Sequence, residues 1–279
     1  MRSTQIQEPK KSSWTISNYN KILLQDNMAR ILAFGDSFVL GDQDDFGKPS
    51  NYHPDFPPTH GMTYPERKEY LKYNVSFVSL IAKHLNVDIV NCSERGASNY
   101  QQLDQLMSLV HNGSLASGDV ILFGFTTIGR DRISVAARNK DTRTNLINDN
   151  LIESGEWDSI EYFDFFYILS VLDSLANTYQ VPIIKFNLFD NLLNKNIKTG
   201  IKFPSKDFIG FELENNLLID ILDDTWGSDT KRARLYHTEL TPDTEHQKYY
   251  TWNRHPSILG HEKIADWFLN NINWKDYIK

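Results

Sequence analysis

The sequence predicts an α/β fold, a three-layer α/β/α sandwich built on a parallel sheet with two long insertions. Two observations predict it. Short and nearly continuous apolar runs recur along the chain, which is typical of strands that are buried on both faces of a sheet. Segments with helical spacing of apolar residues lie between these runs, and strands that alternate with helices form right-handed crossovers and a parallel sheet.

Four apolar runs are predicted to be the strands of this sheet. The first is ARILAFG at residues 29–35, which ends in a glycine. The others are VDIVNC at 87–92, DVILFGF at 119–125 and VPIIKFNLF at 181–189. Each run is short and mostly apolar, as expected of a strand that is covered on both faces.

Four amphipathic helices are predicted between and after the strands, near residues 75–85, 103–110, 160–179 and 257–268. Their apolar residues recur three or four positions apart, which places them on one face of each helix. The most hydrophobic of these segments is interrupted by acidic residues. We therefore interpret it as a buried helix of the sandwich and expect no membrane span.

One domain is predicted to cover residues 29–279, preceded by a polar N-terminal arm at 1–28. Two long insertions, at about 42–73 and 191–250, do not follow the alternation of strand and helix. Loops of this length commonly cover or bind a ligand. Contacts between subunits are an equally good interpretation, so the oligomeric state stays open.

The composition argues against several classes of protein. The 279 residues carry a formal net charge of −7 and scattered basic residues, so the positive field typical of nucleic-acid binding is absent. The single cysteine, Cys92, cannot form an internal disulfide, and the first 28 residues lack the apolar stretch of a secretory signal. We therefore expect a cytoplasmic protein with no signal peptide and no nucleic-acid partner.

Candidate catalytic residues follow the predicted strands, because ligands of parallel sheets bind beyond the carboxyl ends of the strands. Ser37 comes directly after the first strand and Gly35, and a serine at such a turn can present its hydroxyl above the sheet. The alternative is that Asp36 or Ser37 only caps a helix. A serine nucleophile needs a base. Of the eight histidines, His255 is the candidate, because it lies in a loop before the last predicted helix.

Three short blocks of the chain resemble the SGNH (GDSL-like) hydrolase family: GDSF at 35–38, RGASN at 95–99 and RHPSILGH at 254–261. Their order and spacing agree with that family. The resemblance implies a flavodoxin-like sheet, with Ser37 as nucleophile, His255 as base and the backbone amide of Gly96 as an oxyanion donor. The chain is also similar to SGNH-type proteins encoded by tailed bacteriophages, which would place it in a host cytoplasm or a virion.

Two departures from the family pattern affect the expected site. Thr126 stands where the family usually has an asparagine of the oxyanion hole, so Asn99 is a rival donor. Trp252 stands where the family has an acid, three residues before the histidine. The base would then act in a Ser-His dyad, or be oriented by a backbone carbonyl or by a carboxylate such as Asp243 or Glu245.

The resemblance implies an esterase that hydrolyses a small acyl ester, and we favour O-acetyl groups on carbohydrate because aromatic residues of the insertions could stack on sugar rings. His53, Asp55 and His60 are metal-ligand types but lie among prolines, and no phosphate-binding glycine loop is present. We therefore expect neither a metal nor a cofactor. The alternative function is a binding or structural module that keeps the fold and lacks efficient catalysis.

Overall fold

The computed structural model describes residues 29–41, 62–126, 156–188, 208–209, 217–222, 249 and 255–278. The predicted arm at 1–28 and most of both predicted insertions lie outside these ranges. The elements in chain order are β1 (Arg30–Phe34), α2 (Ser37–Leu40), α3 (Tyr64–Asn74), α4 (Phe77–Leu85), β2 (Asp88–Asn91), α5 (Asn99–His111), β3 (Asp119–Phe125), α8 (Glu156–Tyr179), β4 (Ile183–Asn187), β5 (Phe208–Ile209), α10 (Leu217–Leu222), α12 (Ile258–Asn271) and η3 (Trp274–Asp276).

The described strands form one parallel sheet in the order β2-β1-β3-β4-β5. This is the order of flavodoxin-like doubly wound sheets, in which the chain begins near the middle and winds toward both edges. The fold class predicted from the sequence is confirmed. Because all strands run in parallel, the segments that follow β1, β2 and β3 lie together at one end of the sheet.

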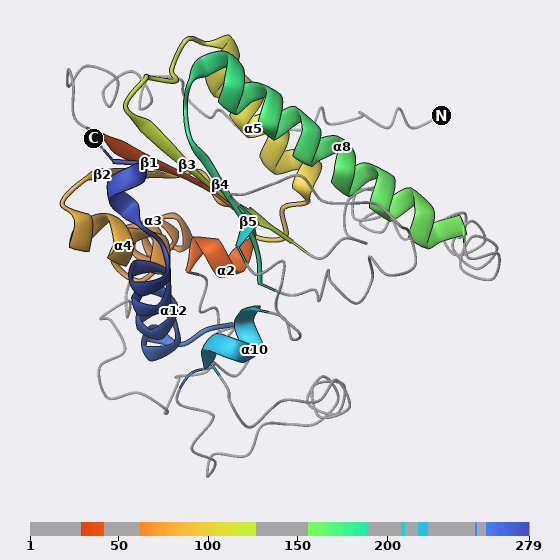
Figure 1. Ribbon diagram of the computed structural model, residues 1–279. Coiled ribbons are helices and arrows are strands. Elements are labelled where there is room, and N and C mark those ends of the chain that lie inside the picture. Colours follow the sequence, from red (N-terminus) through yellow and green to blue (C-terminus); the bar gives the residue numbers. More distant parts are fainter. Residues whose placement is uncertain are drawn as a thin grey trace, which may run out of the picture.

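Helices cover both faces of the sheet and give the molecule three layers (Figure 1). The core on one face includes side chains of α4, α10 and α12, and the core on the other face includes side chains of α5 and α8. Along β1, Ile31 and Ala33 belong to the first core, while Leu32 and Phe34 belong to the second. This alternation is the two-residue period of a strand, and it explains why β1 is apolar from Ile31 to Phe34.

Three elements lie in segments that the sequence analysis assigned to insertions. Helix α3 occupies the end of the 42–73 segment, while β5 and α10 lie within 191–250. Both segments therefore contain regular elements of the sandwich, and their description as insertions stays a prediction. Helix α3 is mostly polar, and among its described side chains only Leu71 and Lys72 are buried. Strand β5 has two residues, which is too short for any periodic pattern.

Within the described ranges, no helix combines the length and the apolar character needed to cross a bilayer. Helix α8 is 24 residues long, and two of its acidic side chains have partners elsewhere in the sandwich. Asp164 accepts a hydrogen bond from the Tyr100 hydroxyl at 2.9 Å, and Asp173 lies 2.5 Å from the Lys185 ammonium of β4. These contacts tie α8 to α5 and to the sheet.

Candidate active site

Ser37 lies at the carboxyl end of β1 as the first residue of the short helix α2. Asp36 precedes it as the N-cap, and its carboxylate accepts a hydrogen bond from the Phe38 amide at 3.0 Å. The turn from strand to helix is tight, since a Cβ on Gly35 would lie 2.2 Å from a methyl carbon of Val39. Asp36 therefore supplies the cap, and Ser37 follows it as a buried residue with 6% of its surface exposed.

His255 reaches Ser37 from the far end of the chain. Its Nε2 lies 2.7 Å from the Ser37 Oγ, within hydrogen-bond distance, although the two residues are 218 positions apart. The imidazole also lies against the Phe38 ring, with the ring centroids 4.9 Å apart. A serine hydroxyl bonded to an imidazole nitrogen is the arrangement in which a base can remove the hydroxyl proton during nucleophilic attack.

The segment that carries His255 is fixed by the start of α12. Ser257 is the N-cap of this helix, and its hydroxyl accepts a hydrogen bond from the Gly260 amide at 3.1 Å. The Ser257 amide donates to the Tyr249 carbonyl at 2.9 Å. Helix α12 itself packs against α4 in the core of one face. The position of the imidazole is thus set by the same layer that covers β1.

Thr126 and Asn99 join the Ser37 turn to two neighbouring segments. Thr126 directly follows β3, and its hydroxyl donates to a carboxylate oxygen of Asp36 at 2.9 Å. Its backbone amide donates to the Oδ1 of Asn99 at 2.8 Å. A hydroxyl carries a single proton, so the Thr126 proton is used on Asp36. The bond to Oδ1 fixes the orientation of the Asn99 amide, whose two protons lie at Nδ2.

Gly96 lies in a tight turn after β2. The Ala97 amide donates to the Glu94 carbonyl at 3.1 Å, and Gly96 within this turn has a φ of 68°. This is the left-handed region, which favours glycine. The Glu94 amide donates to the Gly35 carbonyl at 3.1 Å. The Gly96 turn is therefore bonded directly to the segment that carries Ser37.

The structure places all the predicted site residues on segments that meet at the carboxyl ends of β1, β2 and β3, namely Ser37, Gly96, Asn99, Thr126 and His255. Direct side-chain contact joins Ser37 to His255. The carboxylates considered for orienting the base (Asp243 and Glu245), the Trp252 that stands in place of the family's acid, and the residues considered for a metal (His53, Asp55 and His60) lie outside the described residues.

Two residues of this region have contacts that the sequence analysis missed. Asp36 links the Ser37 turn to Thr126, and the carboxylate of Glu94 pairs with lysines of α3. An aspartate just before a helix start is a recognisable N-cap, so the bond of Asp36 to the start of α2 could be predicted from the sequence. Its bond to a residue 90 positions away leaves no spacing pattern to detect.

Cys92 directly follows β2 and is close in sequence to the Gly96 turn. Its side chain is buried, and burial raises the pKa of the Cys92 thiol to about 11. The residue is therefore a thiol at neutral pH, and a thiol is a much weaker nucleophile than a thiolate. Cys92 accordingly acts as an apolar residue of the core.

No protein-family model and no curated protein matches this chain. Among solved structures, the chain is similar to a member of the lipolytic protein G-D-S-L family from Veillonella parvula DSM 2008. The similarity covers 88% of this chain and 98% of that chain, with 14% sequence identity and a TM-score of 0.34. The fold described above follows from the strand order of the sheet itself. The expected similarity to bacteriophage proteins stays a prediction.

Proposed function

We propose that this protein is an ester hydrolase in which Ser37 is the nucleophile and His255 the general base. The main support is the 2.7 Å contact between the Ser37 Oγ and the His255 Nε2. The pair lies at the carboxyl ends of parallel strands, which is where open α/β sheets bind their ligands. The backbone amides of Ser37 and Gly96 and the side chain of Asn99 lie on the segments that meet there, and donors of these kinds suit acyl transfer.

In the proposed reaction, the Ser37 Oγ attacks the acyl carbonyl while the His255 Nε2 takes up the hydroxyl proton. The bond between the acyl carbon and the alcohol oxygen then breaks, and His255 gives its proton to the leaving alcohol. Water next attacks the acyl-serine, with His255 again as the base, which releases the acid and restores the Ser37 hydroxyl. The reaction consumes only the ester and water, so the proposed scheme uses no cofactor and no metal.

The negative charge that develops on the carbonyl oxygen needs preorganised hydrogen-bond donors. We assign this role to the backbone amides of Ser37 and Gly96 and to the Nδ2 of Asn99. The Thr126 hydroxyl, which the sequence analysis considered as a donor, is bonded to Asp36 instead. Thr126 then acts indirectly, because its backbone amide orients the Asn99 side chain.

The proposed substrate is a small acyl ester, and O-acetyl groups on carbohydrate are the favoured class. Ser37 is only 6% exposed, which suits a short acyl group better than a long chain. The aromatic residues of the predicted insertions are the reason to favour a carbohydrate as the alcohol, since aromatic rings can stack on sugars. The carbohydrate part of the proposal comes from the sequence alone.

Hydrolysis of p-nitrophenyl esters of increasing acyl length tests this function. We expect the acetate ester to be hydrolysed fastest. Ser37→Ala and His255→Ala are expected to lower kcat by at least about a thousandfold. Asn99→Ala is expected to lower kcat by about 100-fold to 1,000-fold, as the loss of an oxyanion donor does. Thr126→Val is expected to lower it less, because its hydroxyl is not a donor in this scheme.

His111→Ala is the matched control, because His111 is an exposed histidine in the last turn of α5. Its kcat is expected to equal that of the wild type. Undiminished hydrolysis by Ser37→Ala would contradict the proposal. A wild-type protein that hydrolyses none of the esters would support the alternative, a module that has the fold and no catalysis. A preference for long acyl chains would contradict the acetyl assignment alone.

A further inference from the structure

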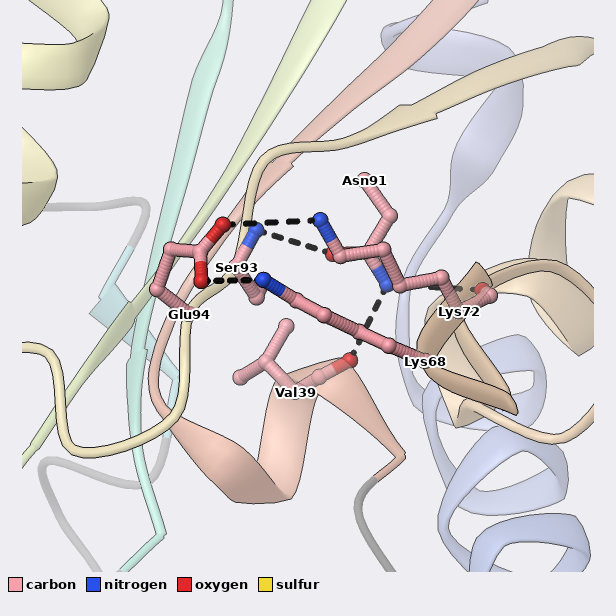
Figure 2. Close-up of polar contacts among 6 residues, drawn as sticks. All are labelled: Val39, Lys68, Lys72, Asn91, Ser93 and Glu94. Carbon is pink, nitrogen blue, oxygen red and sulfur yellow. Dashed lines mark hydrogen bonds and ion pairs between the residues drawn. The ribbon is translucent and has the colours of Figure 1, made fainter. Parts of the chain in front are cut away.

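A cluster of charged side chains lies beside the Gly96 turn and has no part in the reaction proposed above. Lys68 and Lys72 lie one turn apart on α3, and both contact the carboxylate of Glu94 (Figure 2). The Lys68 Nζ lies 2.5 Å from one carboxylate oxygen, and the Lys72 Nζ lies 3.8 Å from the other. One carboxylate is therefore bound between two ammonium groups of the same helix.

The cluster is largely shielded from solvent. The side chains of Lys72, Lys68 and Glu94 are 6%, 16% and 30% exposed. Burial lowers the pKa of Lys72, while the charge of Glu94 acts in the opposite direction and favours the ammonium form. Salt screens partly buried ion pairs less than exposed ones. The cluster can therefore fix the position of the Glu94 side chain more firmly than a surface ion pair would.

The backbone of Glu94 connects this cluster to the proposed active site. Its amide donates to the carbonyl of Gly35, two residues before Ser37. Its carbonyl accepts the hydrogen bond from the Ala97 amide that closes the turn around Gly96. A displacement of Glu94 would therefore move the Gly96 turn relative to Ser37.

Asn91 strengthens the same connection from inside the sheet, as Figure 2 shows. Its Nδ2 lies 3.2 Å from the carbonyl of Val39 in α2 and 3.4 Å from the carbonyl of Lys72 in α3. Its Oδ1 accepts a hydrogen bond from the Ser93 amide at 3.0 Å, directly before Glu94. Helix α3, helix α2 and the segment after β2 thus form one bonded unit.

We propose that Glu94 is a positioning residue for Gly96, and that Lys68 and Lys72 fix its side chain so that the Gly96 amide is held in place for the oxyanion. This inference rests on the proposed function. The oxyanion exists only in the transition state, so a displaced amide lowers kcat and leaves KM nearly unchanged. A purely structural role would lower the melting temperature without changing kcat in the folded protein.

Steady-state hydrolysis of p-nitrophenyl acetate by the full chain tests this inference. Glu94→Ala is expected to lower kcat about tenfold, less than the loss of a whole oxyanion donor, with KM within about twofold of wild type. Lys68→Met is expected to lower kcat in the same direction. In the double variant Glu94→Ala/Lys68→Met, kcat is expected to fall by less than the product of the two single effects, because paired residues do not act additively. The kcat of Glu94→Gln is expected to lie between those of Glu94→Ala and the wild type.

Glu69→Ala is the matched control, because Glu69 is an exposed acidic residue of the same helix. Its kcat is expected to match that of the wild type. Thermal unfolding of each variant ensures that kcat is compared below the melting temperature. An unchanged kcat in Glu94→Ala, or an effect confined to KM or to the melting temperature, would overturn the inference and leave the proposed function standing. A wild-type protein without turnover would overturn both.

Discussion

His261 is a fully buried residue of α12 whose imidazole stacks on the Phe77 ring, with the ring centroids 6.1 Å apart. In the part of the chain that the structure describes, neither of its ring nitrogens has a hydrogen-bond partner. Burial lowers the pKa of His261 to about 3, and the charge of nearby His255 acts in the same direction. The His261 ring is therefore neutral in the folded protein at neutral pH.

This burial predicts a loss of stability in mild acid. Below pH 6.5 the unfolded chain binds a proton at His261 that the folded chain does not bind, so the free energy of unfolding falls as the pH decreases toward 3. The loss at pH 5 amounts to about 2 kcal/mol. Urea unfolding between pH 5 and pH 8 measures it, and His261→Leu is expected to remove this part of the pH dependence.

The control for this prediction is His84→Gln, because His84 is an exposed histidine of α4. Its stability is expected to follow the wild-type pH dependence. If the free energy of unfolding of His261→Leu fell between pH 8 and pH 5 by as much as that of the wild type, the assignment of the acid sensitivity to His261 would be wrong.

Individual residues differ in how well the sequence predicts their contacts. Ser37 and His255 could be predicted as candidates, because each stands next to the end of a regular element and because the chemistry of a serine nucleophile demands a histidine. The pairing of Glu94 with Lys68 and Lys72 could not be predicted. Charged residues are common in the sequence, and an ion pair between distant residues depends on how α3 packs.

At the scale of elements, the tight turn between β1 and α2 leads us to expect that Gly35→Ala lowers both stability and activity. The added Cβ would lie 2.2 Å from the Cγ2 and 2.3 Å from the Cβ of Val39, so a change of side-chain rotamer cannot relieve the clash. Helix α2 must shift, which costs about 1 to 3 kcal/mol and displaces Ser37 from His255. Thermal unfolding and ester hydrolysis are expected to show lower stability and a lower kcat.

Gly118→Ala is the control for that substitution, because the nearest atom to its added Cβ is the Ala29 Cα at 3.8 Å. This variant is expected to keep the wild-type kcat. Full activity of Gly35→Ala would show that the chain can turn into α2 without a glycine, against the geometry described here.

The sequence predicted strands β1, β2, β3 and β4 and helices α4, α5, α8 and α12, and it missed α3, β5 and α10. Of the missed elements, α10 buries Leu217, Leu218, Ile221 and Leu222, but at six residues it is too short to show a helical repeat. Strands β1, β3 and β4 lie within the predicted runs, because their burial makes them nearly continuously apolar. Strand β2 also lies within a predicted run, although it is at the edge of the sheet and only its Asn91 is buried. The sequence at the start of α3 contains a helix-start motif that the sequence analysis did not use. Thr63 and Glu66 form a capping box, and Pro65 lies in the first turn, which together mark a helix start.

At the scale of the whole molecule, the two ends of the sheet have different roles. The carboxyl ends of the strands carry the proposed active site. At the amino ends, Arg30 of β1 binds Asp119 of β3 through two hydrogen bonds of 2.6 Å and 2.8 Å. The Ala116 amide donates to the same carboxylate at 2.7 Å, and Asp119 is only 1% exposed. This end of the sheet contributes to stability without touching Ser37.

Asp119→Asn is therefore expected to lower the free energy of unfolding by about 2 to 4 kcal/mol, because it leaves the Arg30 charge without its buried partner. The kcat of ester hydrolysis is expected to stay at the wild-type value below the melting temperature. Asp88→Asn is the control, since Asp88 is exposed at the start of β2, and it should change stability by less than about 0.5 kcal/mol. Equal losses of stability in the two variants would contradict this division of roles.

The central claim is that His255 activates the hydroxyl of Ser37. Reaction with a fluorophosphonate, followed by mass-spectrometric mapping of the adduct, tests it most directly because the probe requires an activated serine. The account predicts a single adduct on Ser37, absent in Ser37→Ala, strongly slowed in His255→Ala and unchanged in His111→Ala. An adduct on another residue, no adduct at all, or equally fast labelling of His255→Ala would contradict it.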